Sequence, residues 1–251
     1  MEVNLVLSGG AAKGFAHIGV LMALEELGFK IQSISGVSAG AIVGSYYFAG
    51  YSPQEMINLI HKTNWGRLFR PSFPLRSLLS SKQIEQYLRQ TLKKSSFEEL
   101  KGRLYITTLD LKTLSVVTFS SGELIRPLMG SFALPGIFEP IKINEMLLVD
   151  GGIVNNLPVE PLMDKKPCIC VDVTKLSDST PATNIFSVLI RSFNAILKHT
   201  YYIKKTYCDV LIEPDLSKFS MLGLKDANNI VKIGYETAFK NIKSWLECQQ
   251  R

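Results

Sequence analysis

Residues 31–49 read IQSISGVSAGAIVGSYYFA, which is a strand-like run, a tight turn and a helix-forming run in direct succession. The turn, Gly36 to Gly40, matches the pattern G-x-S-x-G with Ser38 at its centre. Glycines at both ends remove the Cβ atoms that would collide where a strand meets a helix. This context predicts a nucleophile elbow, in which the serine stands beside the unpaired N–H groups of a helix N-terminus. The alternative is an ordinary glycine-rich loop.

The composition is that of a globular protein with a large core. Of 251 residues, 46% are hydrophobic and 20% charged, and we expect residues 1–251 to form a single domain. The net charge of +6 comes without a nucleic-acid motif, so a lipid surface or an anionic substrate is the expected partner. No signal-peptide pattern and no apolar run of ~18 residues is present. We therefore expect a cytoplasmic protein with at most peripheral membrane contact.

Strand-like and helix-like segments alternate along the chain. This alternation predicts an α/β fold of three layers, α/β/α, with a central mostly parallel sheet. Strands are expected at residues 3–7, 31–35, 104–109, 115–119, 147–149, 168–173 and 210–212, and helices at about 15–28, 41–49, 53–62, 82–92, 185–197 and 230–245.

The cysteine spacing gives no metal-site or C-x-x-C pattern. Cys168 and Cys170 lie two apart in an apolar run, so they share a face of a strand. We expect them to be buried free thiols in a reducing compartment.

A serine nucleophile needs a base, and the three histidines are poorly placed for this role. Only His199 follows the candidate acid in chain order, and it lies late in an expected helix, while His17 and His61 also lie on helices. Asp150 is the better candidate, because it follows a buried strand at the end where open α/β sheets collect ligand groups. A turn aspartate bonded to its own loop is an equally good interpretation.

A glycine-rich loop follows the first strand. Such a loop at a strand end, opening a helix, presents several backbone N–H groups to one anion. It matches neither the phosphate-binding P-loop nor the dinucleotide fingerprint. Lys13 is expected either to hold the loop and attract an anionic head group, or to be a solvated lysine. The loop reads Gly9-Gly10-Ala11-Ala12-Lys13-Gly14.

These three motifs, in this order, resemble the patatin-like phospholipase family, whose pattern is a G-G-G-x-[KR]-G loop, a G-x-S-x-G elbow and a D-G-[GA] acid. The blocks at residues 131–140 and 155–159 are also similar, and the resemblance extends from about Leu5 to Leu246. It implies a patatin fold without metal or organic cofactor. Ala11 departs from the family's third glycine, and its Cβ restricts φ and narrows the site.

The resemblance also implies a role for each matching residue. Ser38 would be the nucleophile and Asp150 the base of a catalytic dyad. Gly9, Gly10 and Ala11 would form the oxyanion hole. The loop and elbow would be supported by Lys13, Gly14, Gly36, Gly40, Gly151 and Gly152.

The expected activity is therefore a serine acyl hydrolase of the phospholipase A or lysophospholipase type. The alternatives are an acyltransferase with the same dyad and a non-catalytic module that binds membranes or anions. Two segments bear on membrane contact. The aromatic and arginine-rich run at residues 65–76 suits a lipid interface or a loop packed on the core. The basic patch is expected to be a solvated helix end, and comprises Lys198, Tyr201, Tyr202, Lys204 and Lys205.

Overall fold

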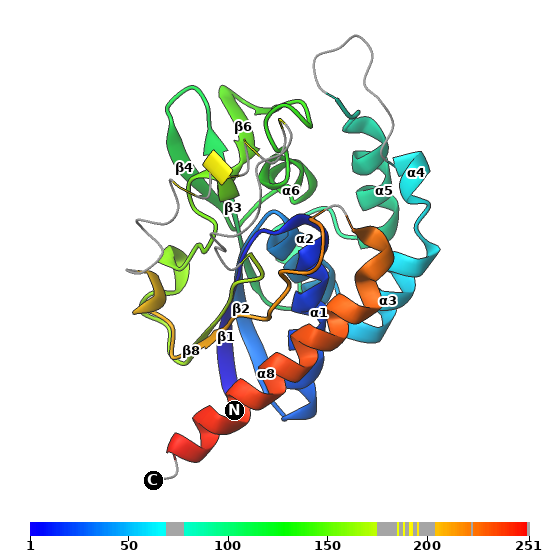
Figure 1. The fold of residues 1–251 in the computed structure, drawn as a ribbon. Coiled ribbons are helices and arrows are strands. Elements are labelled where there is room, and N and C mark those ends of the chain that lie inside the picture. Colours follow the sequence, from blue (N-terminus) through cyan, green and yellow to red (C-terminus); the bar gives the residue numbers. More distant parts are fainter. Residues whose placement is uncertain are drawn as a thin grey trace.

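The computed structural model describes residues 1–68, 78–174, 204–221 and 223–249, with residues 185, 188, 191, 192 and 195. These residues contribute eight strands to one sheet, in the order β5-β6-β3-β2-β1-β7-β8, with β4 paired to β3 (Figure 1). The strands are β1 (Glu2–Leu7), β2 (Lys30–Val37), β3 (Arg103–Asp110), β4 (Ser115–Phe119), β5 (Ile141–Ile143), β6 (Met146–Asp150), β7 (Cys168–Val171) and β8 (Val210–Ile212).

The centre of the sheet is parallel, as predicted. β3, β2, β1, β7 and β8 run in one direction, whereas β4 and β6 are antiparallel to β3, and β5 is antiparallel to β6. The α/β class with a mostly parallel sheet is thereby confirmed. Two elements were not predicted: β5, which is only three residues long, and helix α6 (Ile125–Ser131), which contains a proline.

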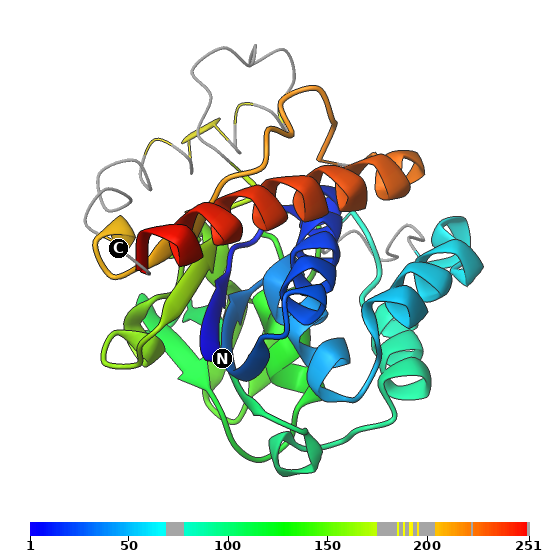
Figure 2. The same ribbon diagram turned by 90° about the horizontal axis from the view of Figure 1, so that it is seen from below.

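The main core lies on one face of the sheet. Helices α1 (Phe15–Glu26), α2 (Ala39–Phe48), α6 and α8 (Ala227–Gln249) cover it, and α8 lies along α1 (Figures 1 and 2). Alternate residues of β1 point into this core, and Val6 points to the opposite face, as the two-residue period of a strand requires.

The outer helices begin and end where the sequence predicts. Ser52 and Glu55 form a capping box at the start of α3 (Pro53–Lys62), which has proline in its first turn. α5 (Lys82–Leu92) follows Ser81, although the Ser81 side chain makes no capping hydrogen bond. In the short α4 (Trp65–Leu68), the ring of Trp65 packs on Phe15 at 6.3 Å between centroids. The start of the aromatic segment therefore packs on the core, and residues 69–77 lie outside the described residues.

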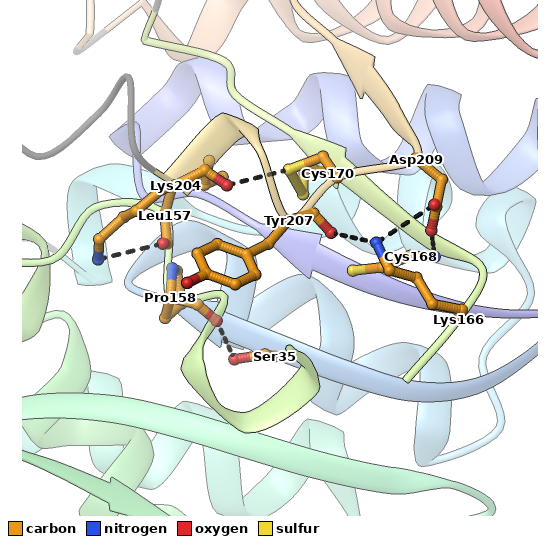
Figure 3. The surroundings of a disulfide bond; sticks show 10 residues. Ser35, Leu157, Pro158, Lys166, Cys168, Cys170, Lys204, Tyr207 and Asp209 are labelled. Atoms are coloured by element: carbon orange, nitrogen blue, oxygen red, sulfur yellow. Dashed lines mark hydrogen bonds and ion pairs between the residues drawn. A yellow bond between two sulfur atoms is a disulfide. The ribbon is translucent and has the colours of Figure 1, made fainter. Parts of the chain in front are cut away.

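The opposite face of the sheet carries a smaller core, closed by a disulfide. Cys170 on β7 is bonded to Cys208, just before β8 (Figure 3). The expectation of a free thiol at Cys170 is therefore wrong, because the β7–β8 pairing brings together two cysteines 38 residues apart. Cys168 is buried and free, as expected, and shares the face of Cys170. The other members of this core are Val6, Leu157, Val159 and Leu162.

The described part of the predicted basic patch is not a solvated helix end. Lys204 has a side chain only 14% exposed, and its ammonium group donates to Asn155 Oδ1 and to Glu160. It also donates to the Leu157 carbonyl (Figure 3). Lys205 pairs with Glu213 at 3.1 Å. Both lysines therefore form ion pairs within the protein. Lys198, Tyr201, Tyr202 and His199, with most of the expected helix at 185–197, lie outside the described residues.

Among the described residues, no helix is both long enough and apolar enough to cross a bilayer.

The disulfide gives a prediction for stability. A bridge across 38 residues restricts the unfolded chain, and its loss should cost about 2–4 kcal/mol. Dithiothreitol should therefore lower the melting temperature of the wild type, while C208S should melt lower from the start and show no further response. Equal melting of the wild type with and without the reductant would contradict the prediction. C248S, which changes an exposed free cysteine, is the matched control.

Candidate active site

Ser38 occupies the turn between β2 and α2, in the strand–turn–helix context that the sequence predicts. Its backbone has φ 53° and ψ −121°, in a region that residues other than glycine rarely adopt. A Cβ on Gly40 would lie 2.3 Å from the carbonyl oxygen of Leu7, so α2 can start against the end of β1 only with glycine there. Gly36 lies one residue before the end of β2, directly under the turn.

Ser131, at the end of α6, holds the backbone of the elbow. The Ser38 N–H donates to Ser131 Oγ at 2.9 Å, and this hydroxyl donates to the Thr107 carbonyl at 2.7 Å. Ser131 is fully buried. Sequence reasoning noted this residue only as the start of a similar block, since nothing local distinguishes a serine that holds a distant backbone from any other buried serine.

Asp150 lies level with Ser38, although not for the predicted reason. Val37 pairs with Thr107 across β2–β3, and the next residue of β3, Thr108, pairs with Asp150. β6 is antiparallel, so its last residue would lie at the opposite edge if the strands overlapped fully. β6 instead pairs only with the end of β3, from Thr108 to Asp110, and runs back to the level of the elbow.

The Asp150 carboxyl group is buried and lies beside Ser38. Burial raises its pKa to about 6, opposed by hydrogen bonds from the Gly152 N–H and the Ser38 side chain. The Gly152 bond to Asp150 Oδ1 is 2.7 Å long, within the turn that Gly151 and Gly152 begin. Asp150 is therefore both a turn aspartate, bonded within its own loop, and a carboxyl group that lies beside the serine.

The glycine loop leaves three consecutive N–H groups available. Within the described chain, no acceptor is found for the N–H groups of Gly9, Gly10 and Ala11, whereas the Ala12 N–H donates to Met221 O and the Lys13 N–H to Gly10 O. Ala11 adopts φ 49°, the left-handed conformation that a third glycine would adopt more easily. Gly14 lies against the elbow, since a Cβ there would be 2.3 Å from that of Ala39.

Lys13 is half-buried rather than solvated. Burial lowers the pKa of its ammonium group, and the negative charge of Asp215 opposes this effect. Lys13 therefore lies within electrostatic range of an acidic residue, Asp215.

The described histidines support structure elsewhere. His17 Nε2 lies 2.8 Å from the Ser8 carbonyl, and because a carbonyl only accepts, Nε2 carries the hydrogen. Burial lowers the pKa of His17 to about 4, so the ring is neutral behind the glycine loop. His61 contacts Asn228 on an exposed surface. Neither histidine is among the described partners of Ser38 or Asp150.

An elbow serine, a carboxyl group beside it and a loop whose N–H groups find no acceptor among the described residues give this α/β protein the site geometry of the serine hydrolases. The chain belongs to the patatin-like phospholipase family, whose family model matches residues 5–163.

Curated relatives carry related names. The chain is 26% identical to "Lysophospholipase NTE1" of Scheffersomyces stipitis over 97% of its length, but spans only 18% of that protein. It is 33% identical to "Uncharacterized NTE family protein Mb1092c" of Mycobacterium bovis, over 64% of this chain and 45% of that one. The chain therefore corresponds to a small part of the yeast protein.

Solved structures share the fold at low identity. VipD from Legionella pneumophila matches 97% of this chain and 66% of its own, with a TM-score of 0.64 at 14% identity. ExoU from Pseudomonas aeruginosa, solved with SpcU, matches 98% and 52%, with a TM-score of 0.56 at 16% identity. These structural matches support the assignment of the fold.

The buried hydroxyl of Ser131 predicts a measurable loss of stability. S131A leaves the Ser38 N–H without an acceptor and the Thr107 carbonyl without this donor, which should cost about 1–3 kcal/mol in urea unfolding. The matched control is S45A, because the equally buried Ser45 hydroxyl donates only to Ala41 O in its own helix. Equal losses in the two variants would contradict the role given to Ser131.

The raised pKa of Asp150 predicts a gain of stability when its charge is removed. The folded state holds this proton more tightly than the unfolded chain, so the wild type loses stability as pH rises through about 6. At ~1.4 kcal/mol for each pH unit between 3.8 and about 6, the loss is ~3 kcal/mol. D150N should therefore be more stable than wild type at pH 8 by up to that amount, and the difference should vanish near pH 4.

The control for D150N is another buried aspartate with the opposite behaviour. Backbone hydrogen bonds, first from Leu147, lower the pKa of Asp110, so D110N should destabilise the protein at pH 8. A D150N variant that is less stable than wild type at pH 8 would show that burial of the charged carboxylate does not destabilise the protein.

Proposed function

We propose that the chain is a serine acyl hydrolase that cleaves carboxylic ester bonds of phospholipids or lysophospholipids through a Ser38–Asp150 dyad. One observation supports the proposal most: a buried carboxyl group, with its pKa raised to about 6, lies beside the elbow serine. A base of this kind is mostly ionised at neutral pH, and it accepts a proton more readily than an exposed aspartate does.

The reaction follows from the positions of these groups. Asp150 takes the proton of Ser38 as the Ser38 oxygen attacks the acyl carbon of the ester. The negative charge on the former carbonyl oxygen is stabilised by the free N–H groups of Gly9, Gly10 and Ala11. The alcohol leaves with the proton from Asp150. Water then attacks the acyl-serine, giving its proton to Asp150. The bond between the acyl carbon and the Ser38 oxygen breaks, Asp150 returns the proton to that oxygen, and the free acid leaves.

The substrate class rests on family membership and on the names of the yeast relatives. A lipid substrate implies contact with a membrane surface, and the net charge of +6 favours an anionic one. A cytoplasmic protein bound peripherally to a membrane fits this function.

The test is hydrolysis of lysophosphatidylcholine micelles and of phosphatidylcholine–phosphatidylglycerol vesicles, followed as released fatty acid. Wild type should release fatty acid from at least one of them and gain a single fluorophosphonate adduct by intact mass. S38A should lose both properties, and D150N should lose at least ~10³-fold in turnover while remaining folded. S45A should behave as wild type. Folded wild type that neither hydrolyses lipid nor is labelled would contradict the proposal and favour a non-catalytic binding module.

A further inference from the structure

Asn156 lies where the glycine loop meets the turn that carries Asp150. A Cβ on Gly9 would lie 2.6 Å from Asn156 Oδ1 and 3.2 Å from the Cβ of Ser38. A Cβ on Gly152 would lie 2.9 Å from Asn156 Oδ1 and also 2.9 Å from Asp150 Oδ1. The Asn156 oxygen therefore lies close to both glycines, each of which is also a near neighbour of one member of the Ser38–Asp150 pair.

The orientation of the Asn156 amide is fixed by its neighbours. Thr174 Oγ1 donates to Asp172 Oδ1 at 2.6 Å, and the Thr174 N–H donates to the same oxygen at 2.8 Å. A hydroxyl has one proton, so Thr174 Oγ1 can only accept from Asn156, at 3.1 Å. Asn156 therefore turns its NH₂ group to Thr174 and its oxygen to the dyad. This series of hydrogen bonds, from Asp172 through Thr174 to Asn156, is called the relay below. Asp172, at its end, is only 2% exposed.

We infer that Asn156 is a positioning residue. The Thr174–Asp172 relay holds its amide group, and its oxygen keeps Asp150 and the glycine loop correctly spaced around Ser38. Two loops from distant parts of the chain must stay correctly spaced for proton transfer and oxyanion binding to act on one acyl group. Asn156 touches both loops with a single neutral oxygen. A neutral group is required there, because a second carboxylate beside Asp150 would hold the proton on the base.

The neighbouring Asn155 supplies a matched control. Its side chain points away from the dyad, accepting from Lys204 and donating to Glu160 at 3.0 Å. Asparagine-to-aspartate changes at 155 and 156 are therefore chemically identical, but only the second places a charge beside Asp150. Among the described residues, the titratable groups around Asn156 are Asp172 at the end of the relay, with Lys13, its neighbour Asp215 and His17 by the glycine loop. Lys204 and Glu160 contact Asn155 instead, so the charge of N155D falls beside them.

The inference rests on the proposed hydrolase function, and its experiment is the pH profile of kcat/KM on the lipid that wild type hydrolyses. In N156D, the midpoint of the acid limb of the kcat/KM profile should shift to higher pH by at least 1 unit. The profile of N155D should superpose on that of the wild type. A purely structural role for Asn156 would lower N156D activity by the same factor at every pH. An acid limb of N156D that coincides with that of wild type would overturn the inference.

A second pair of variants tests the relay without altering Asn156. T174V removes the hydroxyl and should lower kcat about tenfold with little change in KM, while T174S keeps the hydroxyl and should restore kcat. Equal kcat values for T174V and T174S would overturn the relay even if N156D fails to fold. Failure of the proposed function can be distinguished from failure of this inference. In that case, the wild type itself would neither turn over lipid nor be labelled by fluorophosphonate.

Discussion

The register between β3 and β6 places a carboxyl group against the elbow serine, and the site depends on this pairing. Val37 and Thr107 are partners, and Thr108 and Asp150 are partners one residue further on. A slip of one residue would turn the Asp150 side chain to the other face of the sheet. The carboxyl group is also buried, and burial is the main reason that its pKa is raised to about 6. Strand pairing thus sets the position of this group, and burial sets its basicity.

The surrounding groups keep this arrangement in place from several directions. Ser131 holds the backbone of the elbow, and the Ala133 carbonyl accepts from the Asp150 N–H at 3.1 Å. Both belong to the block at residues 131–140 that the sequence marks as similar to the family. The strained φ of Ser38 and the buried charge of Asp150 each reduce stability. The large core on the α1–α8 face, which includes residues of β2 and β3, offsets these losses.

The sequence predicts the central strands and the elbow because short-range rules determine them. Apolar runs bounded by glycines specify β1 and β2, and Ser52-Pro53 specifies the start of α3. What the sequence cannot supply is pairing between distant segments. The antiparallel direction of β6, the Cys170–Cys208 bond and the burial of Lys204 all depend on which segments become neighbours. For the same reason, the relay from Asp172 to Asn156 is invisible in the sequence, although Asn156 lies in a block similar to the family.

Asp150, buried and mostly ionised above about pH 6, is the proposed base that activates Ser38. The most direct measurement is the rate of fluorophosphonate labelling of Ser38 between pH 4.5 and 9, followed by intact mass on wild type and D150N. The account predicts a wild-type rate that rises with a midpoint near pH 6 and then levels off, and a D150N rate that is low throughout. A wild-type rate without an inflection near pH 6, or a D150N rate that follows the wild-type curve, would contradict it.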